Sequence, residues 1–493
     1  MAFTRLNPEE HMRRRQFILL AGVTGIVPPE VRSSTVQESG RFDEIAKLIS
    51  AKMAEHHIPG VAFGVLKNGQ ITARGFGVTN VDDPQPVTPE TVFPIASISK
   101  TVAATALMTR VRQGRVDLKS PVRRYLPEFR VQDEIVSREV MLWHLLTHTP
   151  GWEGQLTAED RGTDTLNFFT AGLRDLPQLA SPGSVWSYNN AGFGVAGRVI
   201  EAVTGKSIHE ALRELVFAPL GMSRAFSRTG EAMTYRFAVG HRQQQGQPGV
   251  IRPFDLSTNV TAGGVATTVD DLLRYAAFHL GDGIGAQGKL VLSRALLEQM
   301  RTAQLRKNST DDEMGIGWQL RRINGVLTAA HGGTLGGHCL HLQLVPDRNL
   351  AFAILTNHTD GWRLIQDVER ATLRSYEGLA LKPNQPIGHR GVNEAMTAHA
   401  TPLTKQPSLE AYVGRYRRPP VGTVEVREQD GKLVVTNQTG GETSNTTIVF
   451  YGPDVAYAIA GSYTGMPMEF VRNQTGAVGW IRINGRIAKK ADI

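Results

Sequence analysis

The spacing of apolar residues divides the chain into two regions with different periodicity. In the first region some segments repeat an apolar residue every three or four positions, which predicts helices, and others form short apolar runs, which predict strands. Residues 42–56 have the helical spacing and residues 61–66 form an apolar run. Asn68-Gly69 then predicts a two-residue turn into a second strand over 71–78. This region therefore begins with a helix and a β-hairpin.

The same region ends with more strands. A helix is predicted from Ser97 to about residue 111, residues 140–235 are mostly helical in pattern, and Thr268 begins a helix over 272–279. Strand patterns return at 317–320, 326–330, 339–345 and 350–355, followed by a closing helix at 361–375. Strands at both ends with helices between them predict a single α+β sheet built from the two ends of the region.

The second region is predicted to be a separate β-domain. Residues 381–407 are rich in proline and glycine, which is typical of a linker. Beyond them, short alternating runs are broken by turn pairs such as Asp430-Gly431 and Asn484-Gly485, which predicts a meander of hairpins forming a small β-barrel. The predicted division is an N-terminal segment at 1–37, a first domain at 38–380, the linker, and a barrel at 408–493.

Composition excludes several classes of function. The net charge is +8, but the basic residues are scattered and form no stripe, so no nucleic-acid partner is predicted. Cys339 is the one cysteine, so no intrachain disulfide can form. No apolar run reaches the roughly 18 residues that would span a membrane.

The N-terminal segment has two interpretations. Arg14-Arg15 precedes a short apolar run at 19–27, which resembles a twin-arginine export signal and would place the protein in the periplasm or outside the cell. The run is short and no Ala-x-Ala cleavage site follows it. The alternative is a basic N-terminal segment of a cytoplasmic protein.

The strongest chemical signal is Ser97-Ile98-Ser99-Lys100. Serine and lysine three positions apart share one face of a helix, so the hydroxyl and the amine can meet. A serine hydroxyl needs a base to take its proton. Lysine can be that base if its pKa falls from about 10.4 towards 7, a change worth roughly 4–5 kcal/mol. The motif alone is short enough to occur by chance, and its alternative interpretation is a helix N-cap with a solvated lysine.

Other motifs follow in order along the chain. They are Tyr188-Asn189-Asn190, the run from His331 to Gly337, and the segments 145–151 and 262–264. With these motifs, residues 42–376 resemble the serine β-lactamase and penicillin-binding-protein superfamily, in particular its class C β-lactamase, D-aminopeptidase, DD-peptidase and esterase branches. The resemblance implies an antiparallel sheet flanked by helices, with an all-helical subdomain.

The resemblance also implies roles for individual residues. Ser97 would be the nucleophile, Lys100 its base, and Tyr188 the group that exchanges protons with the leaving group. His331 takes the place of a lysine or tryptophan found in other branches. A second set would bind the substrate: Asn190 through its amide, Gly333 by allowing close approach, and the backbone N–H groups of Ser97 and Thr334 as the oxyanion hole. His148 is expected to be structural.

These roles predict a serine hydrolase that forms an acyl-enzyme and needs neither cofactor nor metal. At pH 7 a histidine with an ordinary pKa near 6.5 carries little charge. His331 would therefore bind a substrate carboxylate more weakly than the lysine that other branches have at this position. Amide bonds of small peptides are therefore the favoured substrates. The alternatives are short-chain esters, weak β-lactamase activity, and a penicillin-binding or regulatory protein that is acylated without turnover. The oligomeric state is not predicted.

Overall fold

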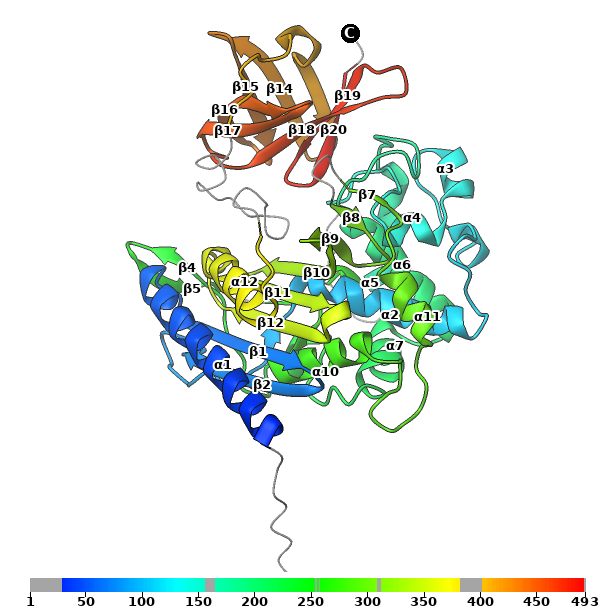
Figure 1. Ribbon diagram of the computed structural model, residues 1–493. Coiled ribbons are helices and arrows are strands. Elements are labelled where there is room, and N and C mark those ends of the chain that lie inside the picture. Colours follow the sequence, from blue (N-terminus) through cyan, green and yellow to red (C-terminus); the bar gives the residue numbers. More distant parts are fainter. Residues whose placement is uncertain are drawn as a thin grey trace, which may run out of the picture.

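A computed structural model describes residues 29–155, 165–252, 255–256, 258–307, 312–381 and 401–491. The export-like sequence before residue 29 and residues 382–400 of the predicted linker lie outside this part of the chain. Figure 1 shows a mixed sheet-and-helix body, with a β-barrel above it that ends at the C-terminus. Within the described residues, no helix combines the length and apolar character that a membrane span requires.

The centre of the body is an eight-stranded antiparallel sheet. Its strands, in spatial order, are β2 (Gln70–Gly77), β1 (Gly60–Lys67), β12 (Leu350–Thr356), β11 (His338–Val345), β10 (Val326–Leu335), β9 (Gln319–Ile323), β8 (Glu313–Met314) and β7 (Leu305–Arg306). Strand β1 pairs with β2 on one side and β12 on the other, with Val61 opposite Thr356. The prediction that one sheet unites both ends of this region is confirmed.

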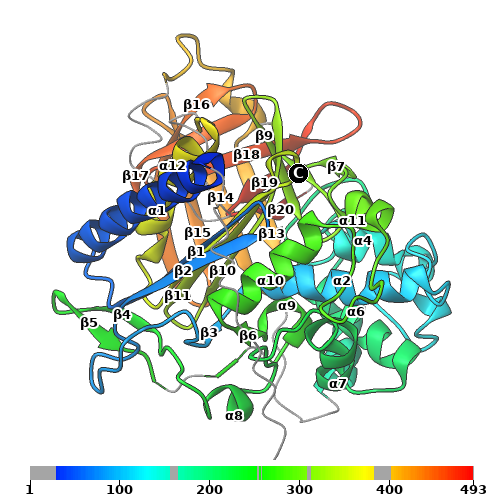
Figure 2. The ribbon, with the colours of Figure 1, turned by 60° about the horizontal axis from the view of Figure 1, so that its bottom comes forward.

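Two layers of helices cover the sheet. Helices α1 (Pro29–Glu55) and α12 (Gly361–Glu377) pack on one face, and Figure 2 shows them side by side over the strands. Helices α2 (Ser99–Arg112) and α10 (Val269–Leu280) pack on the other face. Helix α1 begins at Pro29, earlier than the predicted residue 42. Thr268 caps α10 by accepting a hydrogen bond from the Asp271 amide, as its sequence pattern indicated.

Shorter elements complete the body. The remaining helices are α3 (Glu134–Glu139), α4 (Leu142–Leu146), α5 (Thr165–Ala171), α6 (Asn190–Thr204), α7 (Ile208–Leu212), α8 (Thr229–Ala232), α9 (Val260–Gly263) and α11 (Arg294–Met300). Two small two-stranded sheets pair β3 (Phe93–Pro94) with β6 (Ala266–Thr267) and β4 (His241–Gln244) with β5 (Gln247–Val250).

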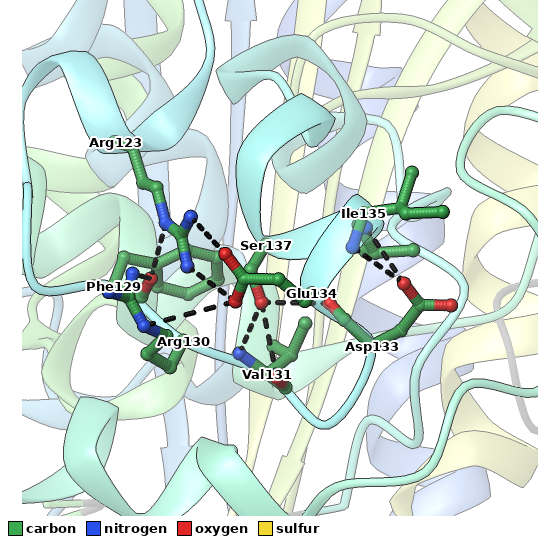
Figure 3. Close-up of polar contacts among 9 residues, drawn as sticks. Arg123, Phe129, Arg130, Val131, Asp133, Glu134, Ile135 and Ser137 are labelled. Atoms are coloured by element: carbon green, nitrogen blue, oxygen red, sulfur yellow. Dashed lines mark hydrogen bonds and ion pairs between the residues drawn. The ribbon is translucent and has the colours of Figure 1, made fainter.

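Side-chain contacts fix the loops of the helical region, as Figure 3 shows around α3. Arg123 binds both carboxylate oxygens of Glu134, at 2.8 and 3.0 Å, and also donates to the Phe129 carbonyl. Asp133 accepts from the amides of the first turn of α3, and Ser137 Oγ ties the helix back to Val131. The bidentate arginine fork and the N-cap add to the burial of Phe129, Val131 and Val136 in the main core, and together they hold this loop.

The C-terminal region is a closed eight-stranded barrel. Its strands are β13 (Gly414–Arg418), β14 (Gly422–Gln429), β15 (Lys432–Thr439), β16 (Glu442–Gly452), β17 (Val455–Gly461), β18 (Pro467–Arg472), β19 (Val478–Ile483) and β20 (Arg486–Lys490). Pairing of β13 with β20 closes the barrel, and buried Tyr416, Phe450 and Phe470 fill it. The predicted barrel is confirmed, with strands that the alternating runs alone did not reveal.

The barrel contacts the body next to residues 179–188. Leu179, Ala180 and Val185 form an apolar cluster with Ile487 of β20. The indole nitrogen of Trp480 donates to the Leu179 carbonyl at 2.8 Å. These contacts bring the β19–β20 hairpin against the segment that carries Tyr188.

Candidate active site

Ser97 lies where a tight turn enters a helix. It is the middle residue of the 3₁₀ turn η1 (Ala96–Ile98), which continues into α2. Ala96 has a φ of 45°, an uncommon value for a residue with a side chain, and the Ile95 amide donates to the Val265 carbonyl at 2.8 Å. The turn is thus held from outside in a strained geometry, with Ser97 half-buried at its apex. The Ser97 N–H belongs to a first helical turn, where amides lack intrahelical acceptors.

Lys100 lies beneath the serine and is completely buried. Its Nζ is 3.2 Å from Ser97 Oγ and 2.6 Å from the carbonyl oxygen of Ala262 in α9. Burial, reinforced by the positive charge of Arg486, holds the pKa of the Lys100 amine well below its ordinary value. The neutral amine is therefore favoured, and it is placed to take the proton of Ser97.

Tyr188 stands over Lys100. Lys100 Nζ is 4.8 Å from the centroid of the tyrosine ring. The backbone around Tyr188 is fixed by His148, whose Nδ1 accepts from the Asn189 amide at 2.9 Å and whose carbonyl accepts from the Ser187 amide. Burial lowers the pKa of His148 well below its ordinary value, so the ring is neutral. His148 thus has the backbone contacts expected of a structural residue.

His331 lies in strand β10, on the side of the site next to Tyr188. It is fully buried, and its ring centroid is 6.5 Å from that of Tyr188. Nδ1 lies 2.7 Å from the Gly332 carbonyl oxygen, which only accepts, so Nδ1 carries the hydrogen. Burial is the main reason that the pKa of His331 falls to about 3. His331 is therefore a neutral imidazole at physiological pH.

One edge of strand β10 faces the turn that carries Ser97. Strand β9 pairs with β10 only as far as Ala330, so among the described strands residues 331–335 are paired on the β11 side alone. A Cβ on Gly333 would lie 2.6 Å from the Ile95 carbonyl oxygen and 3.0 Å from the Ala96 Cβ. The absence of a side chain at this position lets the strand approach the turn that carries Ser97.

Thr334 and Asn190 lie at the edges of this arrangement. Thr334 is exposed, and its Oγ1 accepts from the indole nitrogen of Trp362 at 2.9 Å. Asn190 is the first residue of α6, and its buried Oδ1 has no hydrogen-bond partner among the described residues. An amide oxygen in this position can accept a hydrogen bond from a substrate N–H.

The sequence motifs did not reveal every residue that shapes the site. Ala262, whose carbonyl binds Lys100, lies in a segment noted only for its resemblance. Arg486 lies over the Tyr188 ring, with its Cζ 5.3 Å from the ring centroid, and Glu153 is 4.0 Å from the arginine. The sequence predicted the Asn484-Gly485 turn next to Arg486. It gave no indication that this turn lies against Tyr188.

No group of three or more acidic, histidine or cysteine side chains among the described residues is placed to hold a metal ion. The site itself brings together serine, lysine, tyrosine and histidine side chains. Together they offer a hydroxyl, a buried amine, a phenol ring over that amine, and a neutral imidazole.

Comparisons with known proteins show which family and fold this chain resembles. Residues 45–373 match a family model described as Beta-lactamase. Penicillin-binding protein 4 of Amycolatopsis lactamdurans is 33% identical over 67% of this chain and 89% of its own length. Protein flp of Staphylococcus aureus (strain N315) is 24% identical over 64% of this chain, and the match spans 62% of flp.

Solved structures extend the comparison to the barrel. The crystal structure of SurE is 26% identical, covers 92% of this chain and all of SurE, and has a TM-score of 0.77. A class C beta-lactamase is 22% identical and covers 69% of this chain and 98% of its own, with a TM-score of 0.60, which shows a shared fold. The structural likeness to SurE therefore includes the C-terminal domain as well as the sheet.

Proposed function

Because this chain belongs to the beta-lactamase family, whose members are serine hydrolases, we propose that it hydrolyses amide bonds of small peptides through an acyl-enzyme on Ser97. The observation that carries the proposal is the 3.2 Å contact between Ser97 Oγ and the buried amine of Lys100. The burial that favours the neutral amine also gives the serine its base.

Acylation begins with proton transfer from Ser97 to Lys100. The neutral amine donates one N–H to the Ala262 carbonyl and directs its lone pair towards Ser97 Oγ. As Oγ attacks the substrate carbonyl, its proton passes to Nζ and the carbonyl oxygen becomes an oxyanion. The backbone N–H groups of Ser97 and Thr334 stabilise this oxyanion, a term often worth about 3–4 kcal/mol per donor.

Collapse of the tetrahedral intermediate releases the amine. Tyr188, over Lys100, passes a proton to the leaving nitrogen and is reprotonated from the Lys100 ammonium. Water then attacks the acyl-enzyme by the reverse sequence, which releases the carboxylic acid and restores Ser97. Asn190 Oδ1 holds the substrate amide during acylation, and Gly333 lets the substrate lie along the β10 edge.

The electrostatics of His331 favour substrates without a carboxylate at that point. A neutral imidazole cannot form a charge-assisted hydrogen bond with a substrate carboxylate. The binding free energy lost relative to a cationic side chain at this position is about 1.5–3 kcal/mol. Glu153 lies beside both Arg486 and Arg418, so its carboxylate offsets only part of their positive charge. SurE has been solved with D-Leu, which supports including peptides with D-residues among the candidate substrates.

Covalent labelling tests the nucleophile. Intact mass after treatment with a fluorophosphonate probe should show one adduct on the full-length protein and none on Ser97→Ala. An adduct of equal yield on Ser97→Ala, with activity retained, would falsify the assignment. The matched control is Ser50→Ala, because Ser50 lies in α1 on the opposite face of the sheet and its hydroxyl donates to the Ala46 carbonyl of the same helix.

Turnover tests the substrate class. The rates to compare are kcat/KM for a D-alanine p-nitroanilide, a short linear peptide, p-nitrophenyl butyrate and nitrocefin. We expect the amides to be preferred over nitrocefin. Preference for the butyrate would make the protein an esterase, nitrocefin as the best substrate would make it a β-lactamase, and labelling without turnover would make it an acylated regulatory protein.

The N-terminal sequence provides the argument for the cellular location. We propose export through the twin-arginine-like N-terminal sequence. Fractionation of cells that express the full chain, compared with an Arg14→Lys, Arg15→Lys variant, tests this. Equal amounts in the cytoplasm for both proteins would reject export.

A further inference from the structure

The β19–β20 hairpin of the barrel binds the backbone on both sides of Tyr188. The Tyr188 amide donates to the carbonyl of Gly485 at 2.8 Å. Arg486 Nη1 donates to the Tyr188 carbonyl at 2.9 Å. Both backbone polar groups of the tyrosine are therefore satisfied by two consecutive residues of the other domain, which fixes the plane of its main chain.

Neighbouring contacts extend this clamp along the same segment. The Ile487 amide donates to Ser187 Oγ at 3.2 Å, and Arg482 Nη2 donates to the Trp186 carbonyl at 3.1 Å. Gly485 has a φ of 75°, and a Cβ there would touch the Trp186 ring at 3.4 Å. The tight Asn484-Gly485 turn is thus shaped to lie against the tyrosine segment.

Arg486 also places a positive charge near Lys100, the proposed base. Its Cζ and Lys100 Nζ are 5.3 and 4.8 Å from the same ring centroid, so no more than about 10 Å separates the two cationic groups. The other titratable groups facing Lys100 are His148 and His331, both neutral. Glu153 faces Arg486, and Arg418 lies 3.7 Å from the same carboxylate.

We propose that Arg486 positions Tyr188 and Lys100 for proton transfer, so that the C-terminal barrel completes the active site. The hydrogen bond to the Tyr188 carbonyl sets where the phenol ring lies over the amine. The guanidinium charge disfavours a second positive charge on Lys100. This role rests on the proposed acyl-enzyme chemistry and assigns to the barrel a part in catalysis.

The hydrogen bond and the charge of Arg486 affect the pH profile of the rate in different ways. Loss of a backbone contact lowers the rate at every pH. Loss of the charge raises the pKa of Lys100, so the rise of the acylation rate with pH moves to more alkaline values. For unit charges about 10 Å apart at an effective dielectric constant near 20, the shift is about one pH unit.

The experiment measures the rate of fluorophosphonate labelling of Ser97 between pH 5 and 10 in the full-length protein. The variants are Arg486→Gln, which removes the charge, and Arg486→Lys, which keeps it. Ser187→Ala is the matched control, because it weakens the same clamp without changing any charge. Thermal unfolding of each variant establishes that it is folded.

We expect the midpoint of Arg486→Gln to lie about one unit higher, so that this variant labels up to about tenfold more slowly at pH values below the wild-type midpoint. Arg486→Lys should return the midpoint to that of the wild type, and Ser187→Ala should leave it unchanged. An unmoved midpoint in folded Arg486→Gln would overturn the proposal, whether or not the rate falls. Wild-type protein that is not labelled at Ser97 would instead overturn the proposed function itself, and this inference with it.

Discussion

Gly333→Ala tests whether the approach of β10 to the nucleophile turn is required for activity. The added Cβ would lie 2.6 Å from the Ile95 carbonyl oxygen and 3.0 Å from the Ala96 Cβ. Ordinary contacts of this kind begin at 3.4 Å, so the strand and the turn must separate by roughly 0.8 Å. Neither neighbour can rotate away, because one is backbone and the other is the first atom of a side chain.

The expected loss follows from this displacement. A reacting group misplaced by about 1 Å typically costs on the order of 100-fold in rate, and overpacking of a buried contact costs about 1–3 kcal/mol of stability. We therefore expect kcat/KM on the preferred p-nitroanilide to fall by about 100-fold, with a lower midpoint of thermal unfolding. Labelling by the fluorophosphonate should slow in parallel, since the oxyanion donors separate.

Gly479→Ala is the matched control. Gly479 also lies in a β-strand, in the barrel, and its nearest neighbour to an added Cβ is at 3.5 Å, an ordinary contact. This variant should retain wild-type activity and be equally or slightly more stable. A folded Gly333→Ala protein with activity within threefold of the wild type would refute the argument that this glycine sets the distance between strand and nucleophile.

Three further predictions address the proton path, the specificity and the domain boundary. Lys100→Ala and Tyr188→Phe should each lower kcat by roughly 100-fold, and the double variant should lose less than the product, because the two residues act as a unit; fully multiplicative losses would contradict a shared path. His331→Lys should raise kcat/KM for nitrocefin relative to the neutral butyrate by about tenfold, since it adds a cation for the carboxylate; an unchanged ratio would remove His331 from specificity. Limited proteolysis should cut within 381–407 and release the two domains, whereas cuts first appearing inside the sheet domain would place the boundary elsewhere.

The sequence determined the local structure well because the relevant signals are local. Asn68-Gly69 predicted its hairpin since both residues adopt positive φ angles, which few other residues tolerate. Thr268 predicted the start of α10 through an N-cap that involves only the next three residues. The turn pairs of the C-terminal region predicted a barrel for the same reason, although only the pairing of β13 with β20 defines its closure.

The sequence also placed Ser97 and Lys100 together, because three positions on a helix bring two side chains onto one face. It could not determine the state of the lysine. The pKa of that amine depends on how completely the fold buries it and on a charge from the other end of the chain. His331 shows the same limit, since its ordinary pKa near 6.5 falls to about 3 only inside the packed site.

The tertiary structure alone decided how the two domains meet. Arg486 and Tyr188 lie almost 300 positions apart, and their hydrogen bond has no counterpart in any periodicity or motif. Sequence patterns report which face of an element is apolar, whereas docking depends on the shape of two finished surfaces. Residue type and spacing therefore placed the proposed nucleophile Ser97 beside its proposed base Lys100. Packing between distant segments decided how deeply Lys100 is buried and which barrel residues contact Tyr188.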